Sequence, residues 1–243
     1  MSKVIEVECL VKQFGSFVAV NNLTFSVSKG EIFGLLGANG AGKTTTIRML
    51  CGLLAPSSGK ILVSGYDAFT QPEQIRASIG YMSQKFSLYS DLTVWENIRF
   101  FGGIYGLWGA ELKKRAEELV DEFSMHEFQN VKVESLPMGW RQRISLAVSL
   151  VHRPPVIFLD EPTSGVDPIA RRMFWETIHQ ISSGGTTVLV TTHYMDEAEY
   201  CHTALIMVDG KIVAMDKPKV LKEQMKAQSM NEVFITLARN GNS

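Results

Sequence analysis

The segment that most constrains this sequence is Gly37-Ala-Asn-Gly-Ala-Gly-Lys43-Thr44, which fits the spacing G-x-x-x-x-G-K-[ST]. An almost continuous apolar run, residues 31–36, comes directly before it, and Ile47, Leu50 and Leu54 follow it at helical spacing. A strand, a glycine-rich turn and a helix in this order form a βα unit whose backbone N–H groups converge at the helix start. The sequence therefore predicts a phosphate-binding loop inside an α/β sheet.

Two side chains at the end of this loop add chemistry that glycines lack. Lys43 supplies a positive charge for the β- and γ-phosphates of a nucleotide, and the Thr44 hydroxyl is suited to bind Mg²⁺. A glycine-rich turn without any ligand is the simpler alternative, but the strand before it and the helix after it favour phosphate binding.

Beyond the loop, the apolar pattern switches repeatedly between the periods of strands and helices. Residues 4–35 alternate apolar and polar side chains and predict several short strands. Further strands are expected at 61–63, 79–83, 155–159 and 187–191, helices at 72–77 and after Asp167-Pro168, and a hairpin at Asp209-Gly210 between 204–208 and 212–215. Because buried strands that alternate with helices form parallel sheets, we expect an α/β fold.

Strand signals disappear between residues 86 and 151. The helices expected there cover 94–105, 111–123 and 141–151. We therefore predict one unit over residues 1–243, in which 1–85 and 152–243 form the core and 86–151 are an inserted helical subdomain.

Composition excludes several classes of protein. The 24 Lys and Arg residues against 25 Asp and Glu give a net charge of −1, so we expect no nucleic-acid partner. Hydrophobic residues make up 45% of the chain, yet no run of 18 apolar residues and no signal peptide is visible, which predicts a cytoplasmic location. Cys9, Cys51 and Cys201 lie too far apart for a zinc site, and we expect all three to be buried.

Polar residues end three of the predicted strands. Asp160 and Glu161 follow the strand at 155–159, where ligands bind in open α/β sheets. We expect Asp160 to anchor the water shell of Mg²⁺ and Glu161 to orient or deprotonate a water that attacks a γ-phosphate. His193 is expected to hydrogen-bond that phosphate, and Gln84 to reach the metal or the water. Taken singly, each has an ordinary alternative as a solvated strand end or a surface residue.

In this order, the residues resemble the ATP-binding subunit of an ABC transporter over essentially the whole chain. The phosphate loop, Gln84, Asp160-Glu161, Ser164–Asp167 and His193 match the family's Walker A, Q-loop, Walker B, D-loop and switch histidine. The resemblance implies a RecA-like P-loop NTPase core with an N-terminal antiparallel β subdomain and an inserted α-helical subdomain, which hydrolyses ATP with Mg²⁺.

The resemblance also assigns individual residues. It implies ATP contacts from Phe14, Gly37, Ala38, Asn39, Gly40, Ala41, Gly42, Lys43, Thr44 and Thr45, with the Phe14 ring as a platform for adenine. It implies catalytic roles for Lys43, Gln84, Glu161 and His193, and metal contacts from Thr44, Gln84 and Asp160.

One segment departs from the family pattern. Where the family usually has Leu-Ser-Gly-Gly-Gln, this chain has Leu136-Pro137-Met138-Gly139-Trp140. In the family this signature segment and the D-loop, here with Asp167, act on the ATP held by the opposite subunit. Pro137 lacks the serine hydroxyl and an N–H, and Trp140 replaces a polar side chain. Either the subgroup tolerates a weaker closure, or the opposite site is degenerate beside a consensus site in a heterodimer or tandem chain.

Partners follow from the same resemblance. Asp91–Asn97 and the aromatic residues after it look like the subgroup that serves separate exporter-type permeases for drugs, ions or surface polymers. This implies a second nucleotide-binding domain and transmembrane permease subunits as partners, at the inner face of the cell membrane. The aromatic residues form either the core of the helical subdomain or a groove for a cytoplasmic helix of the permease: Trp95, Phe100, Phe101, Tyr105 and Trp108.

Two rival functions remain open at this point. One is a soluble ABC-type ATPase without a permease, which acts on ribosomes or in regulation. The other is a nucleotide-binding regulatory module without turnover, against which Glu161 and His193 both argue.

Overall fold

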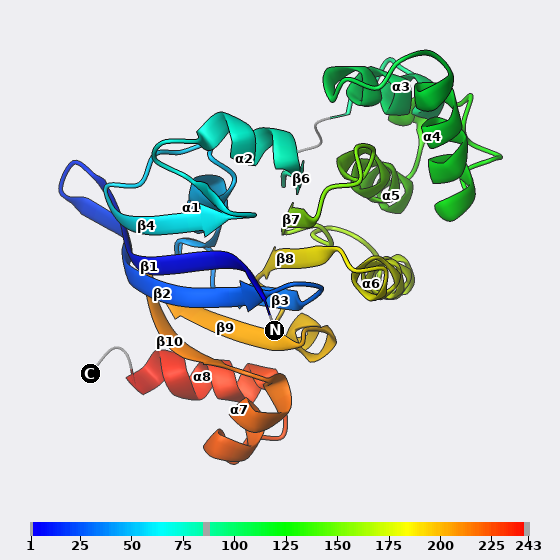
Figure 1. Cartoon of the computed structure of the whole chain (residues 1–243). Coiled ribbons are helices and arrows are strands. Elements are labelled where there is room, and N and C mark those ends of the chain that lie inside the picture. Colours follow the sequence, from blue (N-terminus) through cyan, green and yellow to red (C-terminus); the bar gives the residue numbers. More distant parts are fainter. Residues whose placement is uncertain (1, 85–87, 241–243) are drawn as a thin grey trace.

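Two β-sheets and the helices around them make up the fold (Figure 1). The computed structural model describes residues 2–84 and 88–240. A four-stranded antiparallel sheet has the order β2-β1-β4-β5, with β1 (Lys3–Phe14), β2 (Phe17–Ser28), β4 (Ser58–Val63) and β5 (Tyr66–Asp67). A six-stranded sheet has the order β10-β9-β3-β8-β7-β6, with β3 (Ile32–Leu36), β6 (Ile79–Met82), β7 (Val156–Asp160), β8 (Thr187–Thr192), β9 (Thr203–Val208) and β10 (Lys211–Asp216).

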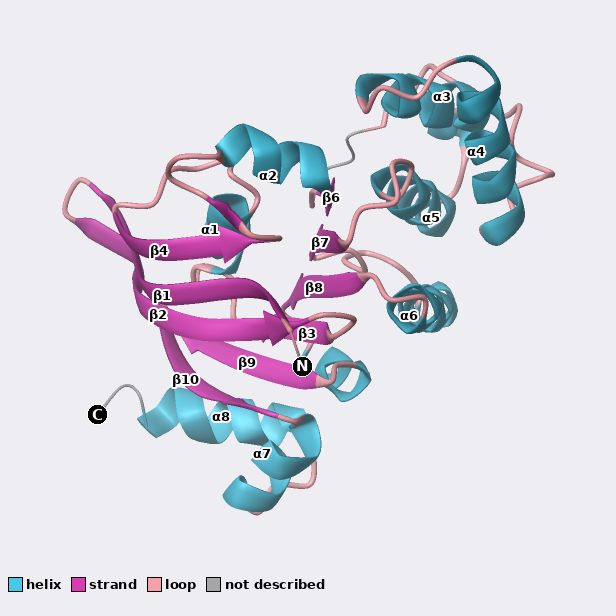
Figure 2. Cartoon of the chain, in the orientation of Figure 1, coloured by secondary structure: helices cyan, strands magenta, loops and turns pink. Residues whose placement is uncertain are grey.

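The helices lie on both sides of the six-stranded sheet (Figure 2). They are α1 (Lys43–Leu50), α2 (Pro72–Ser78), α3 (Val94–Ile104), α4 (Gly109–Glu122), α5 (Met138–Ser149), α6 (Pro168–Ser183), α7 (Pro218–Met225) and α8 (Met230–Asn240), with two 3-10 helices, η1 (Val133–Ser135) and η2 (Met195–Tyr200). In the part of the chain that the structure describes, none of the helices combines the length and the apolar character needed to cross a bilayer.

Strand β7 shows how the sheet separates two hydrophobic cores. Its residues alternate sides, as the two-residue period of a strand requires. Val156 and Phe158 pack in the core that contains α1 and the antiparallel sheet, whereas Ile157 and Leu159 pack in the core of helices α3 to α6. Strands β6, β7, β8, β3 and β9 run parallel and β10 is antiparallel at the edge, which confirms the predicted α/β class.

The N-terminal strands are longer than predicted. Residues 4–35 contain two bulged strands of 12 residues each before β3, rather than several short ones. Register shifts interrupt the apolar alternation, one of them between Val7 and Leu10, so a single long strand reads like two short ones. Cys9 lies in that interval with φ of 48° and is exposed, so its predicted burial was wrong, while Cys51 and Cys201 are buried.

Helix α1 ends earlier than the apolar spacing suggested. Leu54 was predicted to continue the helix, but α1 stops at Leu50 because the left-handed Gly52 (φ 64°) turns the chain away. The N–H groups of Leu53 and Leu54 then both donate to the carbonyl of Arg48, at 2.9 and 3.1 Å.

Helices α3, α4 and α5 fall where the sequence predicted helices, with α5 starting at Met138 instead of Arg141. Gly139 and Trp140 therefore lie in the first turn of α5. The boundary predicted at residues 85 and 86 lies outside the described residues. The hairpin at Asp209-Gly210 is confirmed, whereas helices α7 and α8, which cover β9 and β10, were not predicted.

Candidate active site

The phosphate loop connects β3 to α1, and two of its glycines have no room for a side chain. Gly42 has φ of 97°, and a Cβ there would lie 2.6 Å from the carbonyl oxygen of Ala19. A Cβ on Gly37 would lie 2.5 Å from the carbonyl oxygen of Met207. The loop is thus held between β2 and β9. The first N–H groups of α1 lack partners within the helix, which makes this helix start suited to bind an anion.

Lys43 is the first residue of α1, and its side chain turns back over the loop. Its Nζ donates to the carbonyl oxygens of Gly37 and Ala38 at 2.9 and 3.1 Å. The same Nζ lies 3.3 Å from Oε1 of Glu161, and the two side chains are 4% and 6% exposed. A buried ammonium and a buried carboxylate at this distance compensate each other's charge.

Asp160 ends β7 and accepts two hydroxyl hydrogen bonds on one oxygen. Thr44 and Thr191 donate to its Oδ1 at 3.1 and 2.6 Å. Burial raises the pKa of Asp160 above its usual value, against the opposing effect of those two hydrogen bonds. A hydroxyl and a carboxylate side by side are hard oxygen donors that fit Mg²⁺, which takes one or two protein ligands and fills its shell with water and phosphate oxygens.

Glu161 is the centre of a second group of polar contacts. Its Oε2 accepts from Nε2 of Gln84 at 3.1 Å and lies 3.0 Å from Nδ1 of His193. The residue has φ of 49°, a left-handed conformation that is uncommon outside glycine and is found at functional sites. Thr191 fixes this turn, because its carbonyl oxygen and its hydroxyl both accept from the Glu161 N–H, at 3.1 and 3.0 Å.

Four of these residues, Lys43, Thr44, Gln84 and Glu161, line one cavity of about 410 Å³, whereas Asp160 and His193 contact that lining without being part of it. It is lined by Phe17, Ala19, Asn39, Gly40, Gly42, Lys43, Thr44, Thr45, Gln84 and Glu161. The aromatic lining residue is Phe17, which is 64% exposed, whereas Phe14 stands opposite it in the β1–β2 hairpin with Lys12 Nζ 4.9 Å from its ring centroid. The assignment of Phe14 as the adenine platform stays a prediction, and Phe17 is a candidate that the sequence did not indicate.

The start of α5 is built differently from the phosphate loop. Pro137 is the N-cap residue and offers no side-chain hydrogen bond to the helix. The Trp140 ring lies 4.4 Å from the ring of Phe128 and 5.2 Å from the Arg143 guanidinium, so it packs toward the helical part of the molecule. Leu136 is buried, which leaves only its backbone for contacts with another subunit.

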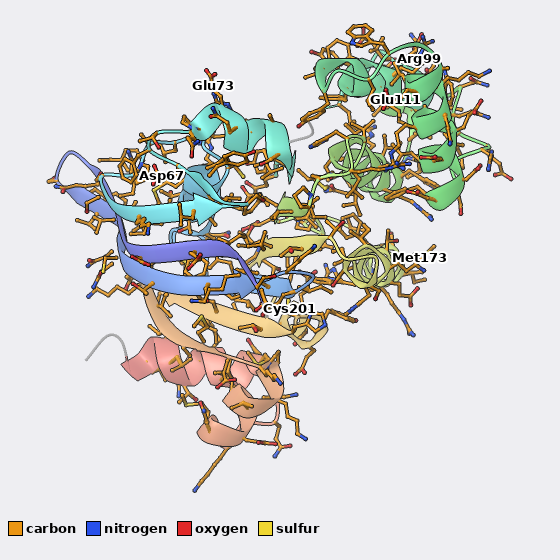
Figure 3. All side chains as sticks on the ribbon, in the orientation of Figure 1. Asp67, Glu73, Arg99, Glu111, Met173 and Cys201 are labelled. Carbon is orange, nitrogen blue, oxygen red and sulfur yellow. The ribbon has the colours of Figure 1, made fainter. Side chains whose placement is uncertain are left out.

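Asp167 caps α6 as the sequence predicted. Its Oδ1 accepts from the N–H groups of Ile169 and Ala170, both at 3.0 Å. Asp167 also lines a groove of about 310 Å³ between α5 and α6, together with Pro137, Gly139, Trp140 and Met173, the last labelled in Figure 3. None of residues 136–140 lines the cavity at the phosphate loop.

Sequence reasoning missed a set of buried polar partners behind the site. Thr191 joins Asp160 to Glu161, yet within an apolar strand it reads as an ordinary β-branched residue. Thr163 and Glu197 form a hydrogen bond of 2.5 Å although 34 residues separate them. No local spacing connects such a pair, so only the fold reveals it.

Three comparisons with known proteins are informative. The family model described as "ABC transporter" matches residues 20–164. A probable multidrug ABC transporter ATP-binding protein of Escherichia coli is 48% identical over 229 residues, which cover 94% of this chain but only 39% of that protein. The chain thus spans about two fifths of the length of this relative.

A relative that the chain covers more fully is the linearmycin resistance ATP-binding protein of Bacillus subtilis. It is 37% identical over 245 aligned residues, which cover 97% of this chain and 79% of that protein. Among solved structures, the dimeric post-hydrolysis state of the ATP-binding cassette MJ0796 bound to ADP and Pi superposes with a TM-score of 0.79 at 25% identity, over 88% of this chain and 98% of that one.

Proposed function

This chain belongs to the ABC transporter family, and from that premise we propose that it binds and hydrolyses ATP to power export through a separate transmembrane permease. The observation that carries the proposal is the meeting of Lys43, Asp160, Glu161, Gln84 and His193 at one edge of the sheet. In-line attack of water on a γ-phosphate requires a positive charge at the phosphates, a metal ligand and a general base, and Lys43, Asp160 and Glu161 would supply these three groups.

Each side chain takes a definite part in this reaction. The loop N–H groups and Lys43 bind the β- and γ-phosphates, and Glu161 exchanges its contact with Lys43 for the attacking water. Gln84 and His193 hold the Glu161 carboxylate through the hydrogen bonds described above and orient it toward that water. Negative charge that develops on the transferred phosphoryl group is stabilised by Lys43 and the helix N-terminus.

Magnesium fits the donor set of this edge. Thr44 and Asp160 would hold the ion, with Gln84 within reach of its water shell. When bound, Mg²⁺ neutralises phosphate charge and orients the γ-phosphate for attack.

We further infer that two such chains, or this chain and a second cassette, close around the nucleotides. Residues 136–140 and Asp167 lie outside the cavity of their own phosphate loop, so they are available to the site of a partner. The backbone N–H groups at the start of α5 and the dipole of this helix would face the partner's γ-phosphate. Both alternatives for the variant signature, a weakened site or a degenerate one, remain compatible with this arrangement.

A patch of exposed apolar side chains on α3 and the turn after it supports a permease as the second partner. Trp95, Phe101 and Tyr105 pack against the core, but Phe100, Ile104 and Trp108 are exposed, the last by 71%. The three exposed residues line a hollow of about 600 Å³ together with Arg99, which Figure 3 labels. Exposed apolar surface of this kind marks interaction sites, and a cytoplasmic helix of a permease would fit it and hold the chain at the inner face of the membrane.

The decisive experiment is phosphate release by the purified chain with Mg-ATP, compared with Glu161→Gln. We expect the variant to lose about 10²–10⁴-fold in rate, the usual contribution of a general base, and to elute as an ATP-bound dimer. Glu117→Gln, an exposed exchange on α4, is the matched control. A wild-type chain without turnover would favour the regulatory module, and a Glu161→Gln variant that releases phosphate normally would refute the catalytic assignment.

Membrane flotation tests the export role against a soluble ATPase. With a co-expressed permease the chain should float with the membranes, and Trp108→Ala together with Ile104→Ser should reduce the bound fraction. Ribosome co-sedimentation without any membrane binding would favour the soluble alternative.

A further inference from the structure

A buried carboxylate lies behind the site and has no part in the chemistry described so far. Glu197 belongs to η2, the turn after β8, and only 1% of its surface is exposed. Its Oε1 accepts a hydrogen bond from the hydroxyl of Thr163 at 2.5 Å, and its Oε2 is buried and has no hydrogen-bond partner among the residues that the structure describes. Burying a carboxylate is costly unless nearby groups compensate its charge, so a cation is expected beside Glu197.

Arg171 of α6 provides the compensating charge. Its Nε lies 3.6 Å from Oε1 of Glu197, and its guanidinium carbon lies 4.2 Å from the ring centroid of Tyr194. The same guanidinium reaches the carbonyl oxygen of Val166 at 3.4 Å. Arg171 therefore touches both the segment after β7 and the segment after β8.

These two segments are the ones that carry the reactive groups. The segment after β7 begins with Glu161 and continues through Thr163, and the segment after β8 begins with His193, whose ring packs 4.1 Å from that of Tyr194. At the candidate active site, the two segments meet through the contact between Nδ1 of His193 and Oε2 of Glu161, at 3.0 Å. Glu197, which belongs to the segment after β8, forms a second connection through its hydrogen bond with Thr163 of the segment after β7.

We propose that Glu197, bonded to Thr163 and paired with Arg171, is a positioning residue that sets the distance between His193 and Glu161. The proposal rests on the function proposed above. Because Thr163 and Val166 belong to the segment that ends in Asp167, the same contacts fix the part of the chain that faces a partner subunit. Loss of the Thr163 hydroxyl frees the two segments to move apart, and the His193–Glu161 contact loosens while nucleotide binding at Lys43 is unaffected.

The test is a double-mutant cycle on phosphate release by the full chain. Thr163→Val removes the hydroxyl at nearly constant volume, and we expect kcat to fall about tenfold, which corresponds to about 1.4 kcal/mol, with KM for ATP unchanged. In a His193→Ala background the same exchange should lower the rate less than twofold, because the contact it supports is already gone. Thr163→Ser keeps the hydroxyl and should restore most of the rate.

Thr177→Val is the matched control, since the Thr177 hydroxyl donates within its own helix, to the carbonyl of Met173 on α6 at 3.0 Å. If Thr163→Val fails to fold, Glu197→Gln replaces it, because the amide keeps an acceptor for Thr163 but loses the charge that faces Arg171. The positioning role would be overturned if Thr163→Val lowered kcat equally in the wild-type and His193→Ala backgrounds. It would also be overturned if Thr163→Val raised KM instead of lowering kcat. A wild-type chain without turnover would instead defeat the proposed function, so the two failures are distinguishable.

Discussion

The phosphate loop and the start of α5 are both helix N-termini that can face phosphate, yet they are constructed in opposite ways. At the loop, mostly buried side chains from α1, β8 and the end of β7 converge: Lys43 on Glu161, and Thr44 and Thr191 on Asp160. At α5, Pro137 gives no side-chain cap and Trp140 turns toward Phe128. The start of α1 depends on side-chain contacts, whereas the start of α5 offers mainly backbone groups. Substitutions at the two helix starts should therefore have very different effects.

Among the substitutions that separate these two helix ends, the largest effect is expected from Lys43→Ala. It removes the charge that we propose binds the β- and γ-phosphates and leaves Glu161 buried without its cation, so turnover should fall about 10²–10³-fold and Mg-ATP affinity should weaken. Phosphate release and nucleotide titration measure both. Lys113→Ala, an exposed lysine on α4, should behave as wild type. Unaltered affinity and rate in Lys43→Ala would refute the phosphate-loop assignment.

Asp160→Asn should separate function from stability. Turnover with Mg-ATP should fall about 10²-fold, because a neutral amide is a poor anchor for the metal. Without metal and nucleotide, however, the variant should be more stable by about 1 kcal/mol, or about 2–4 °C in Tm, since Asn keeps the Oδ1 that accepts from Thr44 and Thr191. Asp121→Asn, at an exposed position, is the control.

The pH dependence of that stability gain has a definite sign. The raised pKa of Asp160 means that the folded chain holds this proton more tightly than the unfolded chain. The bound proton on Asp160 therefore stabilises the fold fully at pH values below the unfolded-state pKa of 3.8. This stabilisation is lost as the pH rises through the folded-state pKa. The difference in Tm between Asp160→Asn and wild type should shrink as the pH falls through this window. A difference independent of pH would show that the buried charge is not its cause.

A smaller effect is expected at the start of α5. Pro137→Ser with Met138→Gly restores a hydroxyl and an N–H, so turnover should rise about two- to tenfold, the value of one added hydrogen bond. Pro137→Ser alone adds an N-cap and should raise the free energy of unfolding by about 1 kcal/mol. If turnover in a purified homodimer does not change although stability rises, the composite site is degenerate and the difference between the two helix ends is functional.

The smallest effect on turnover is expected from Trp140→Gln. Because the indole ring packs on Phe128 and Arg143, its loss should mainly lower the free energy of unfolding, by about 1 kcal/mol. Thermal unfolding measures this directly. A large gain in turnover with unchanged stability would mean that Trp140 obstructs a partner's nucleotide rather than supports the helical part.

Sequence reasoning succeeded where the physical signal is local. The phosphate loop, the buried strand that ends in Asp160 and the Asp167 cap each depend on neighbouring residues, and the structure places them as predicted. It failed where a local turn or bulge overrode the apolar spacing. Leu54 kept helical spacing but Gly52 ended α1, and a bulge near Cys9 masked one long strand.

At the site, the limit is sequence separation. Chain order identified Gln84, Glu161 and His193, because each follows a strand, but it did not reveal how they bond to one another. Thr191 and Glu197 were missed because their partners lie about 30 or more residues away, where no spacing rule applies.

The position of β3 in its sheet has a consequence for how the chain matures. This strand delivers the phosphate loop, yet both of its neighbours, β8 and β9, come from residues 187–208. During synthesis, residues 32–45 leave the ribosome long before either neighbour exists, and such distant pairings are slow to form. A nascent chain that ends before residue 187 should therefore fail to retain nucleotide, and the ability to bind it should emerge late and all at once.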